Sequence, residues 1–190
     1  MHSVLFLGTP AFACPSLEAL RADPAFTVTH VVTQPDKPAG RGNVLQFPPV
    51  KELARTLHIP VLQPRDINAE WKNFGLPKPD FLVVVAYGQM LSRELLAFPR
   101  IAPVNLHPSL LPRWRGASPL AHAILEGDAE TGVTLQRMVP ELDAGPILAQ
   151  ENIPIGSRET RLSLEEKLVS LGASLLVRTL KEPLRETLQD

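Results

Sequence analysis

Two polar side chains placed two residues apart, Asn105 and His107, are of the types that carry proton-transfer chemistry. The run Val104-Asn105-Leu106-His107 predicts a strand, and alternate side chains of a strand project from the same face. An amide can donate to a developing oxyanion, and an imidazole can move a proton at neutral pH. Polar residues that merely close a strand would look the same, so the pair alone is a weak signal.

A carboxylate that could join this pair lies downstream, at Asp143 in the segment ELDAGP of residues 141–146. From a loop between two strands, such a carboxylate could orient His107 or position a water. An Asp before small turn residues is also a common turn former. Glu141 in the same segment is a competing candidate, and spacing does not choose between the two acids.

The elements that must position these residues alternate along the chain. Apolar runs predict strands at residues 4–7, 28–32, 59–62, 81–86, from 104, 132–139 and 146–153. Helices are predicted near residues 10–20, at 50–57 and 119–125, and on the shared face of Leu164, Leu168, Leu171 and Leu175. Residues 33–42 predict a loop, and the polar residues 185–190 resemble the start of a linker. The alternation favours an α/β fold with a Rossmann-like, open, mostly parallel sheet and helices on both faces. Ligands bind such sheets at the carboxyl ends of strands, where Asn105 and His107 lie.

Composition narrows the class of protein. The chain is 44% hydrophobic and 21% charged, as expected of an ordinary globular domain. Its net charge of −1 means that a nucleic-acid footprint would have to be a local patch. One cysteine, Cys14, allows no internal disulfide and fits a reducing compartment; on its predicted helix it is expected to serve packing. No run reaches the roughly 20 apolar residues of a membrane span, so we expect a cytoplasmic protein without membrane contact.

Several motifs together carry a family resemblance. Residues 105–112 (NLHPSLLP) are similar to the signature of the 10-formyltetrahydrofolate-dependent formyltransferases, and residues 142–145 (LDAG) resemble their aspartate loop. Further segments look like those of the members that formylate methionyl-tRNA. These are residues 6–10 (FLGTP), 33–42 (TQPDKPAGRG), 83–88 (VVVAYG), 113–119 (RWRGASP) and 127–134 (GDAETGVT). The similarity is collinear over nearly the whole chain.

The resemblance implies a role for each matching position. Asn105, His107 and Asp143 would form a catalytic trio that moves a formyl group from 10-formyltetrahydrofolate to the α-amino group of initiator methionyl-tRNA for translation initiation, with no metal. The folate site would be lined by Ser109, Leu110, Leu111 and Pro112, with Tyr87 and Gly88 nearby. Arg41 resembles the arginine that engages the tRNA acceptor end, and a basic patch could comprise Lys37, Arg41, Arg113 and Arg115. Trp114 could stack on a base or simply anchor its loop.

Two departures leave the acceptor open. The family often carries lysines after its Gly-Arg-Gly segment, whereas here NVLQ follows at residues 43–46, which weakens contact with phosphates. The family also continues into a C-terminal β-barrel that helps hold tRNA, so residues 1–190 are expected to be the catalytic domain alone. We also expect a monomer. One alternative is a formyltransferase that acts on an amino sugar linked to a nucleotide, although the sequence of residues 38–42 argues against it. The other is a folate-binding module without catalysis.

Overall fold

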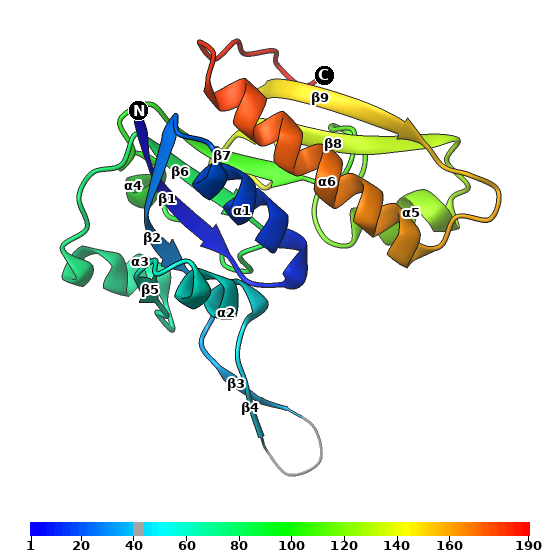
Figure 1. Ribbon diagram of the computed structural model, residues 1–190. Helices are drawn as coiled ribbons and strands as arrows, with labels where there is room; N and C mark the ends of the chain where they lie inside the picture. Colours follow the sequence, from blue (N-terminus) through cyan, green and yellow to red (C-terminus); the bar gives the residue numbers. More distant parts are fainter. Residues whose placement is uncertain (40–43) are drawn as a thin grey trace. The chain divides into compact units, whose positions relative to one another are not determined.

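The computed structural model describes residues 1–39 and 44–190, which fall into two compact units. The first unit comprises Met1–Pro103 and the second Val104–Asp190. Figure 1 labels the elements of both. No helix among these described residues is long and apolar enough to cross a membrane.

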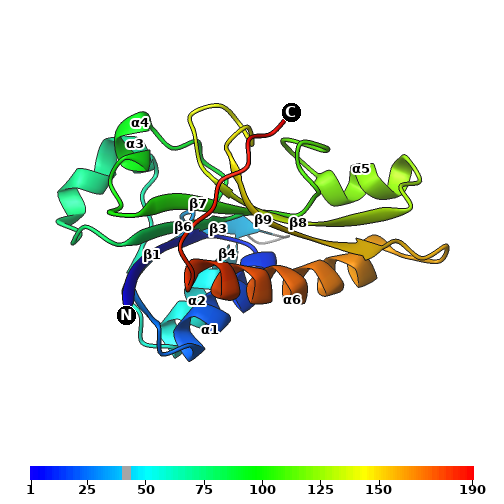
Figure 2. The same ribbon diagram turned by 90° about the horizontal axis from the view of Figure 1, so that it is seen from above.

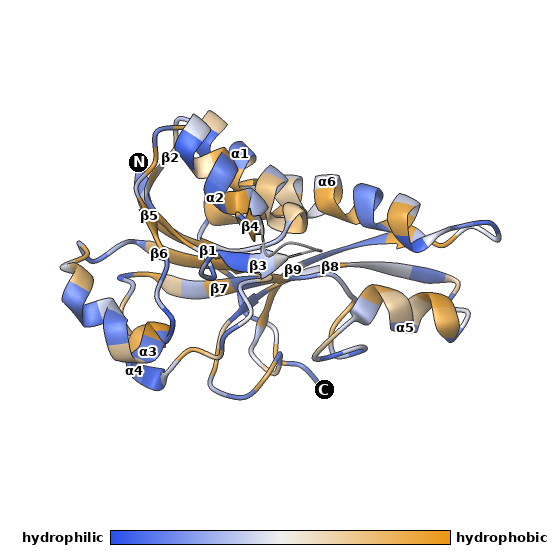
Figure 3. Ribbon diagram, turned by 90° about the horizontal axis from the view of Figure 1, so that it is seen from below, coloured by the Kyte–Doolittle hydropathy of each residue, from blue (hydrophilic) through white to orange (hydrophobic). Residues whose placement is uncertain are grey.

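Parallel strands form the sheet of the first unit (Figure 1). They are β1 (His2–Gly8), β2 (Phe26–Val32), β5 (Val61–Leu62) and β6 (Phe81–Val85), in the spatial order β5-β2-β1-β6. Every residue of β6 is buried, as its uninterrupted apolar run predicted. Figure 3 shows the hydrophobic residues gathered on these strands.

Helices cover both faces of this sheet (Figure 2). On one face lie α1 (Cys14–Ala22), which follows the short 3-10 turn Ala11–Ala13, and α2 (Pro49–Thr56); on the other lie α3 (Ile67–Glu70) and α4 (Arg93–Leu96). The sequence did not predict α3, the 3-10 turn Trp71–Phe74 that follows it, or α4. Helices α3 and α4 have four residues each, and their N-termini are capped by the side chains of Asp66 and Ser92. One turn of helix is too short for an apolar period to register.

The segment predicted as a loop at residues 33–42 contains a strand, which corrects that prediction. Lys37–Ala39 forms β3, antiparallel to β4 (Val44–Gln46). Breaker residues such as Pro38 suggested a loop, but pairing with residues five to nine positions away in sequence satisfies the backbone there.

The second unit contains β7 (Ala102–His107), which begins just before the unit boundary, β8 (Glu130–Arg137) and β9 (Ile147–Pro154). These strands lie in the order β7-β8-β9, and β8 is antiparallel to both of its neighbours. Helix α6 (Arg161–Leu180) packs on β8 and β9, and α5 (Pro119–Leu125) contacts β8 and α6 (Figure 1). Three of the four leucines that predicted α6, at positions 164, 168 and 175, are fully buried.

The residues after α6 differ from the predicted linker. Thr187 pairs with Ile147 through two backbone hydrogen bonds, of 2.7 and 2.9 Å, beside the start of β9. The Arg137 guanidinium also binds the Glu186 carboxylate at 2.6 Å. Its polar and charged residues resembled the start of a linker, whereas its backbone and one carboxylate bond to upstream residues of the second unit.

Candidate active site

The structure brings Asn105, His107 and Asp143 together. Asn105 Nδ2 donates to Asp143 Oδ1 at 3.3 Å, and His107 Nδ1 lies 3.5 Å from Asp143 Oδ2. The His107 and Asp143 side chains are only 7% and 9% exposed. Glu141, the competing acid from sequence, is exposed on the same loop. Of the two acids, Asp143 is therefore the one in contact with the strand-end pair.

Asp143 is fixed by more than these two contacts. Gln136 Nε2 donates to its Oδ1 at 2.8 Å, and the Gly116 backbone N–H donates to its Oδ2 at 2.9 Å. Its backbone has φ +49°, in the left-handed region that non-glycine residues rarely adopt. An unusual backbone conformation at a functional position persists only when its surroundings determine it.

The two nitrogens of His107 face different acceptors. Nε2 lies 2.9 Å from the Trp114 carbonyl oxygen, which can only accept, so Nε2 must carry a proton. Nδ1 faces the Asp143 carboxylate. The two groups lie within ion-pairing distance, 3.5 Å, when the imidazole is protonated. The imidazole is therefore oriented from both sides.

The loop after β7 is tied to β8 by a buried hydroxyl. Thr134 Oγ1 donates to the Ser109 carbonyl at 2.6 Å and accepts from the Leu111 N–H at 3.1 Å. Gln150 Nε2 donates to the same hydroxyl oxygen at 2.9 Å and to the Leu111 carbonyl at 2.8 Å. Among the loop residues predicted to line a folate site, Ser109 and Leu111 are buried, Leu110 is half-buried and Pro112 is exposed.

The other predicted folate contacts, Tyr87 and Gly88, lie in the first unit directly after β6. The Tyr87 side chain is 1% exposed, and burial together with Glu70 and Asp66 raises the pKa of its phenol. Its carbonyl accepts from Thr9 Oγ1 at 2.9 Å, and Gly88 has φ +92°.

The residues predicted as a basic patch divide between the two units. Arg113 pairs with Asp128, and Arg115 donates to Gln189, both within the second unit. Lys37 is exposed on β3, and Arg41 lies outside the described residues. Trp114 is anchored, because its indole donates to Asp128 at 2.7 Å and stacks on His122 at 5.2 Å between ring centroids.

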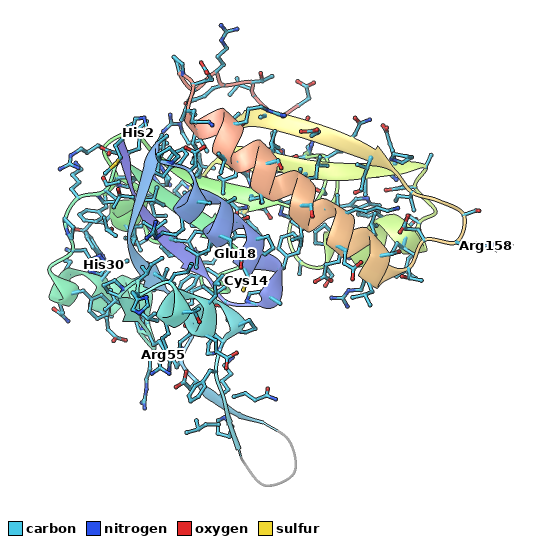
Figure 4. All side chains as sticks on the ribbon, viewed as in Figure 1. His2, Cys14, Glu18, His30, Arg55 and Arg158 are labelled. Carbon is cyan, nitrogen blue, oxygen red and sulfur yellow. The ribbon has the colours of Figure 1, made fainter. Side chains whose placement is uncertain are left out.

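Cys14 lies on α1 near Glu18 (Figure 4). Burial, followed by the charges of Glu18 and Glu52, raises the pKa of its thiol to about 11. The thiol therefore stays protonated at neutral pH, in keeping with the packing role expected from sequence.

Sequence reasoning missed Gln136, Thr134, Gly116 and Gln189 as parts of this site. Two of them follow from strand register, because Asn105 lies opposite Gln136 and His107 opposite Thr134 in the β7·β8 pair. Cross-strand neighbours share a face, so the spacing of Thr134 and Gln136 mirrors that of the catalytic candidates. The two-residue spacing of Thr134 and Gln136 can be seen in the sequence, but the strand register that places them opposite Asn105 and His107 cannot.

Comparison with known proteins sets this geometry in a family. Residues 2–180 match the formyl transferase family. This chain belongs to that family. Over 187 residues, 97% of the chain, it is 49% identical to the methionyl-tRNA formyltransferase of Pelobacter propionicus. Over 180 residues, 94% of the chain, it is 47% identical to that of Moorella thermoacetica. The chain spans 58% of the length of each of these two curated relatives.

Solved formyltransferases share the fold. The crystal structure of phosphoribosylglycinamide formyltransferase from Bacillus halodurans has a TM-score of 0.76 at 24% identity, covering 94% of this chain and 93% of that one. The N-formyltransferase from Helicobacter canadensis, in complex with folinic acid and dTDP-3-aminofucose, has a TM-score of 0.73 at 21% identity. It matches 100% of this chain and 68% of its own. The predicted α/β class with a mostly parallel sheet is confirmed.

Proposed function

We propose that this member of the formyl transferase family moves a formyl group from 10-formyltetrahydrofolate to the α-amino group of initiator methionyl-tRNA. The observation that carries the proposal is the contact of one buried carboxylate, Asp143, with both Asn105 and His107. The acceptor is proposed from the 44–49% identity to relatives named methionyl-tRNA formyltransferase. As the chain spans little more than half their length, their substrate is transferred here as a proposal.

Asn105 is suited to stabilise the oxyanion. The amine lone pair attacks the formyl carbon, and the carbonyl π electrons move to oxygen. The Asn105 amide has two Nδ2 hydrogens, and the bond to Asp143 uses one of them and fixes which end of the amide is nitrogen. The second hydrogen can donate to the oxyanion, an effect of about 10²–10³ in rate per donor in other enzymes.

His107 and Asp143 are suited to proton transfer. The attacking amine must lose a proton, and N10 of the folate must gain one as its bond to the formyl carbon breaks. A protonated His107 can donate through Nε2 once the substrate oxygen replaces the Trp114 carbonyl as acceptor. An oxyanion accepts more strongly than that neutral carbonyl, so the exchange favours the tetrahedral species over the ground state. Asp143 can balance the imidazolium charge or hold the water that relays the amine proton.

The test is a formylation assay with purified protein, 10-formyltetrahydrofolate and methionyl-initiator tRNA. We expect Asp143→Asn to lower kcat by about 10²-fold or more, because the carboxylate that orients His107 is lost. Glu141→Gln, on the same loop but exposed, is the matched control and should stay near the parent rate.

Each other result has a definite meaning. Near-parental kcat for a folded Asp143→Asn variant would remove Asp143 from the trio. Turnover of a nucleotide-linked amino sugar, with none of methionyl-tRNA, would replace the proposed acceptor. Tight folate binding without transfer to either acceptor would favour the non-catalytic module.

A further inference from the structure

The side chain of Gln189, two residues beyond the Thr187–Ile147 bridge, contacts the loop that carries Asp143. Gln189 Nε2 donates to the Gly145 carbonyl at 2.7 Å and to the Asp143 carbonyl at 3.0 Å. A third acceptor, Gln136 Oε1, lies 3.4 Å away. An amide nitrogen has two hydrogens, so the two nearer carbonyls take them.

The other end of this amide binds a second loop of the site. Gln189 Oε1 accepts from Arg115 Nε at 3.0 Å and from Arg115 Nη2 at 2.7 Å. The next residue, Gly116, donates its N–H to Asp143 Oδ2. The Asp143 and Arg115 loops are thus joined twice, once directly and once through the Gln189 side chain.

The loop that Gln189 holds has little freedom and an uncommon backbone. Asp143 has φ +49°, and a Cβ added at Gly145 would lie 1.8 Å from the Arg137 carbonyl oxygen. Such a conformation depends on neighbouring contacts to hold it. Two of those contacts come from one side chain outside the family's matched segment, residues 2–180.

We propose that Gln189 is a positioning residue for formyl transfer, which clamps the backbone of the Asp143 loop to Arg115 so that the carboxylate stays in register with His107. The inference rests on the proposed catalytic role of Asp143. Gln189 need not touch the substrate, because its effect on the reaction passes through the Asp143 backbone.

The test compares Gln189→Met, similar in length but without the amide, with Leu188→Ala, at a neighbouring side chain that is 79% exposed. In the intact protein we expect Gln189→Met to lower kcat about tenfold, with KM for folate and acceptor within about twofold. Exchange of the Gly116 amide hydrogen should accelerate about tenfold, since its acceptor Oδ2 is less well fixed. Leu188→Ala should change none of these.

The outcomes separate this inference from the proposed function. If Asp143→Asn retains activity, the catalytic trio fails whatever Gln189 does, and Gly116 exchange still reports on the clamp. If Asp143→Asn is inactive while Gln189→Met matches the parent in kcat, the positioning role is overturned. A lower kcat with unchanged Gly116 exchange also overturns it, because the effect then travels by another route.

Two further variants keep the inference testable. In an Asp143→Asn background, Gln189→Met should cause no additional loss, since both act through one group; independent, additive losses would contradict the proposal. Should Gln189→Met fail to fold, Gln189→Glu serves instead, because it keeps an acceptor for Arg115 but offers none of the donors that the two carbonyls need. A Gln189→Glu variant with parental kcat would overturn the clamp.

Discussion

At the scale of single residues, the site depends on hydroxyl and amide groups that are held by several hydrogen bonds each. Thr134 is fully buried, and its hydroxyl bonds both Ser109 and Leu111 in the loop predicted to hold folate. Thr131, on the same strand, is 2% exposed, and its Oγ1 has no hydrogen-bond partner among the described residues. The two threonines thus carry the same hydroxyl group, but that of Thr134 is fully hydrogen-bonded and that of Thr131 is not.

Replacing each threonine by isosteric valine should therefore have different effects on the free energy of unfolding. Thr134→Val leaves the Ser109 carbonyl and the Leu111 N–H without their partner, which should lower the free energy of unfolding by about 1–3 kcal/mol and raise KM for folate. Thr131→Val removes an unsatisfied hydroxyl and should be neutral or stabilising. Urea denaturation measures both, and equal losses in the two variants would contradict the hydrogen-bond account.

The sequence predicted which residues would meet but not how they would be held. Asn105 and His107 were identifiable as a pair because a strand has a fixed two-residue period, whereas Asp143 was distinguished from Glu141 only by the family resemblance. Gln136 and Gly116 were not, because strand register and the course of a loop depend on pairing between distant segments. Gln189 was hidden further, in a polar segment whose composition suggested no structure.

At the scale of elements, a partly buried ion pair ties α2 to the segment that leads into β3. Lys51 Nζ lies 2.6 Å from Asp36 Oδ2, and Gln63 Nε2 donates to Asp36 Oδ1 at 2.8 Å. The bond from Gln63, and then that from Lys51, holds the pKa of Asp36 below its usual range. A lowered carboxylate pKa contributes stability above the unfolded-state value, and that stability is lost as pH falls through the folded-state value.

Lys51→Met should therefore raise the pKa of Asp36 toward its usual range and move the acid loss of stability to higher pH. As pH is lowered from about 7 to about 3, the urea midpoint should begin to fall at a higher pH in the variant than in the parent. Lys72→Met is the control, because Lys72 and its partner Glu94 are 58% and 63% exposed and exposed pairs contribute little. Parallel curves for parent and Lys51→Met would show that the pair does not set the profile.

Element types were predictable wherever a period could repeat. The four leucines that predicted α6 define a helix that runs from Arg161 to Leu180, and the apolar run at β6 was assigned within one residue. The one-turn helices α3 and α4 gave no period, and β3 was obscured by prolines. Short elements are determined by caps and by partners elsewhere in the chain, which a local pattern does not contain.

At the scale of the whole molecule, the catalytic candidates and their supporting contacts all belong to the second unit, residues 104–190. That unit includes the segment after α6, in which Glu186, Thr187 and Gln189 each bond to residues upstream. A chain shortened to residues 1–180 keeps α6 complete but loses all of these bonds.

We expect this shortened chain to fold with a free energy of unfolding lower by about 1–3 kcal/mol, because two backbone hydrogen bonds, one ion pair and the side-chain hydrogen bonds of Gln189 disappear. The loop at residues 141–146 should be cleaved faster in limited proteolysis, since its clamp is gone. Calorimetry and protease digestion measure these effects, and removal of Asp190 alone is the control. An unchanged Tm and unchanged digestion would show that the segment does not support the site.

The position of Gln189 also bears on how parts of such proteins can be exchanged. The segment matched to the formyl transferase family ends at residue 180, which makes that point an obvious joint for a chimera. A foreign sequence joined there would supply its own residue where Gln189 reaches Arg115 and the Asp143 loop. The catalytic strand and loops of one protein would then contact a C-terminal segment taken from another protein. A joint after residue 190 keeps the clamp with the loops that it holds, so the segment to exchange is longer than the segment matched to the family.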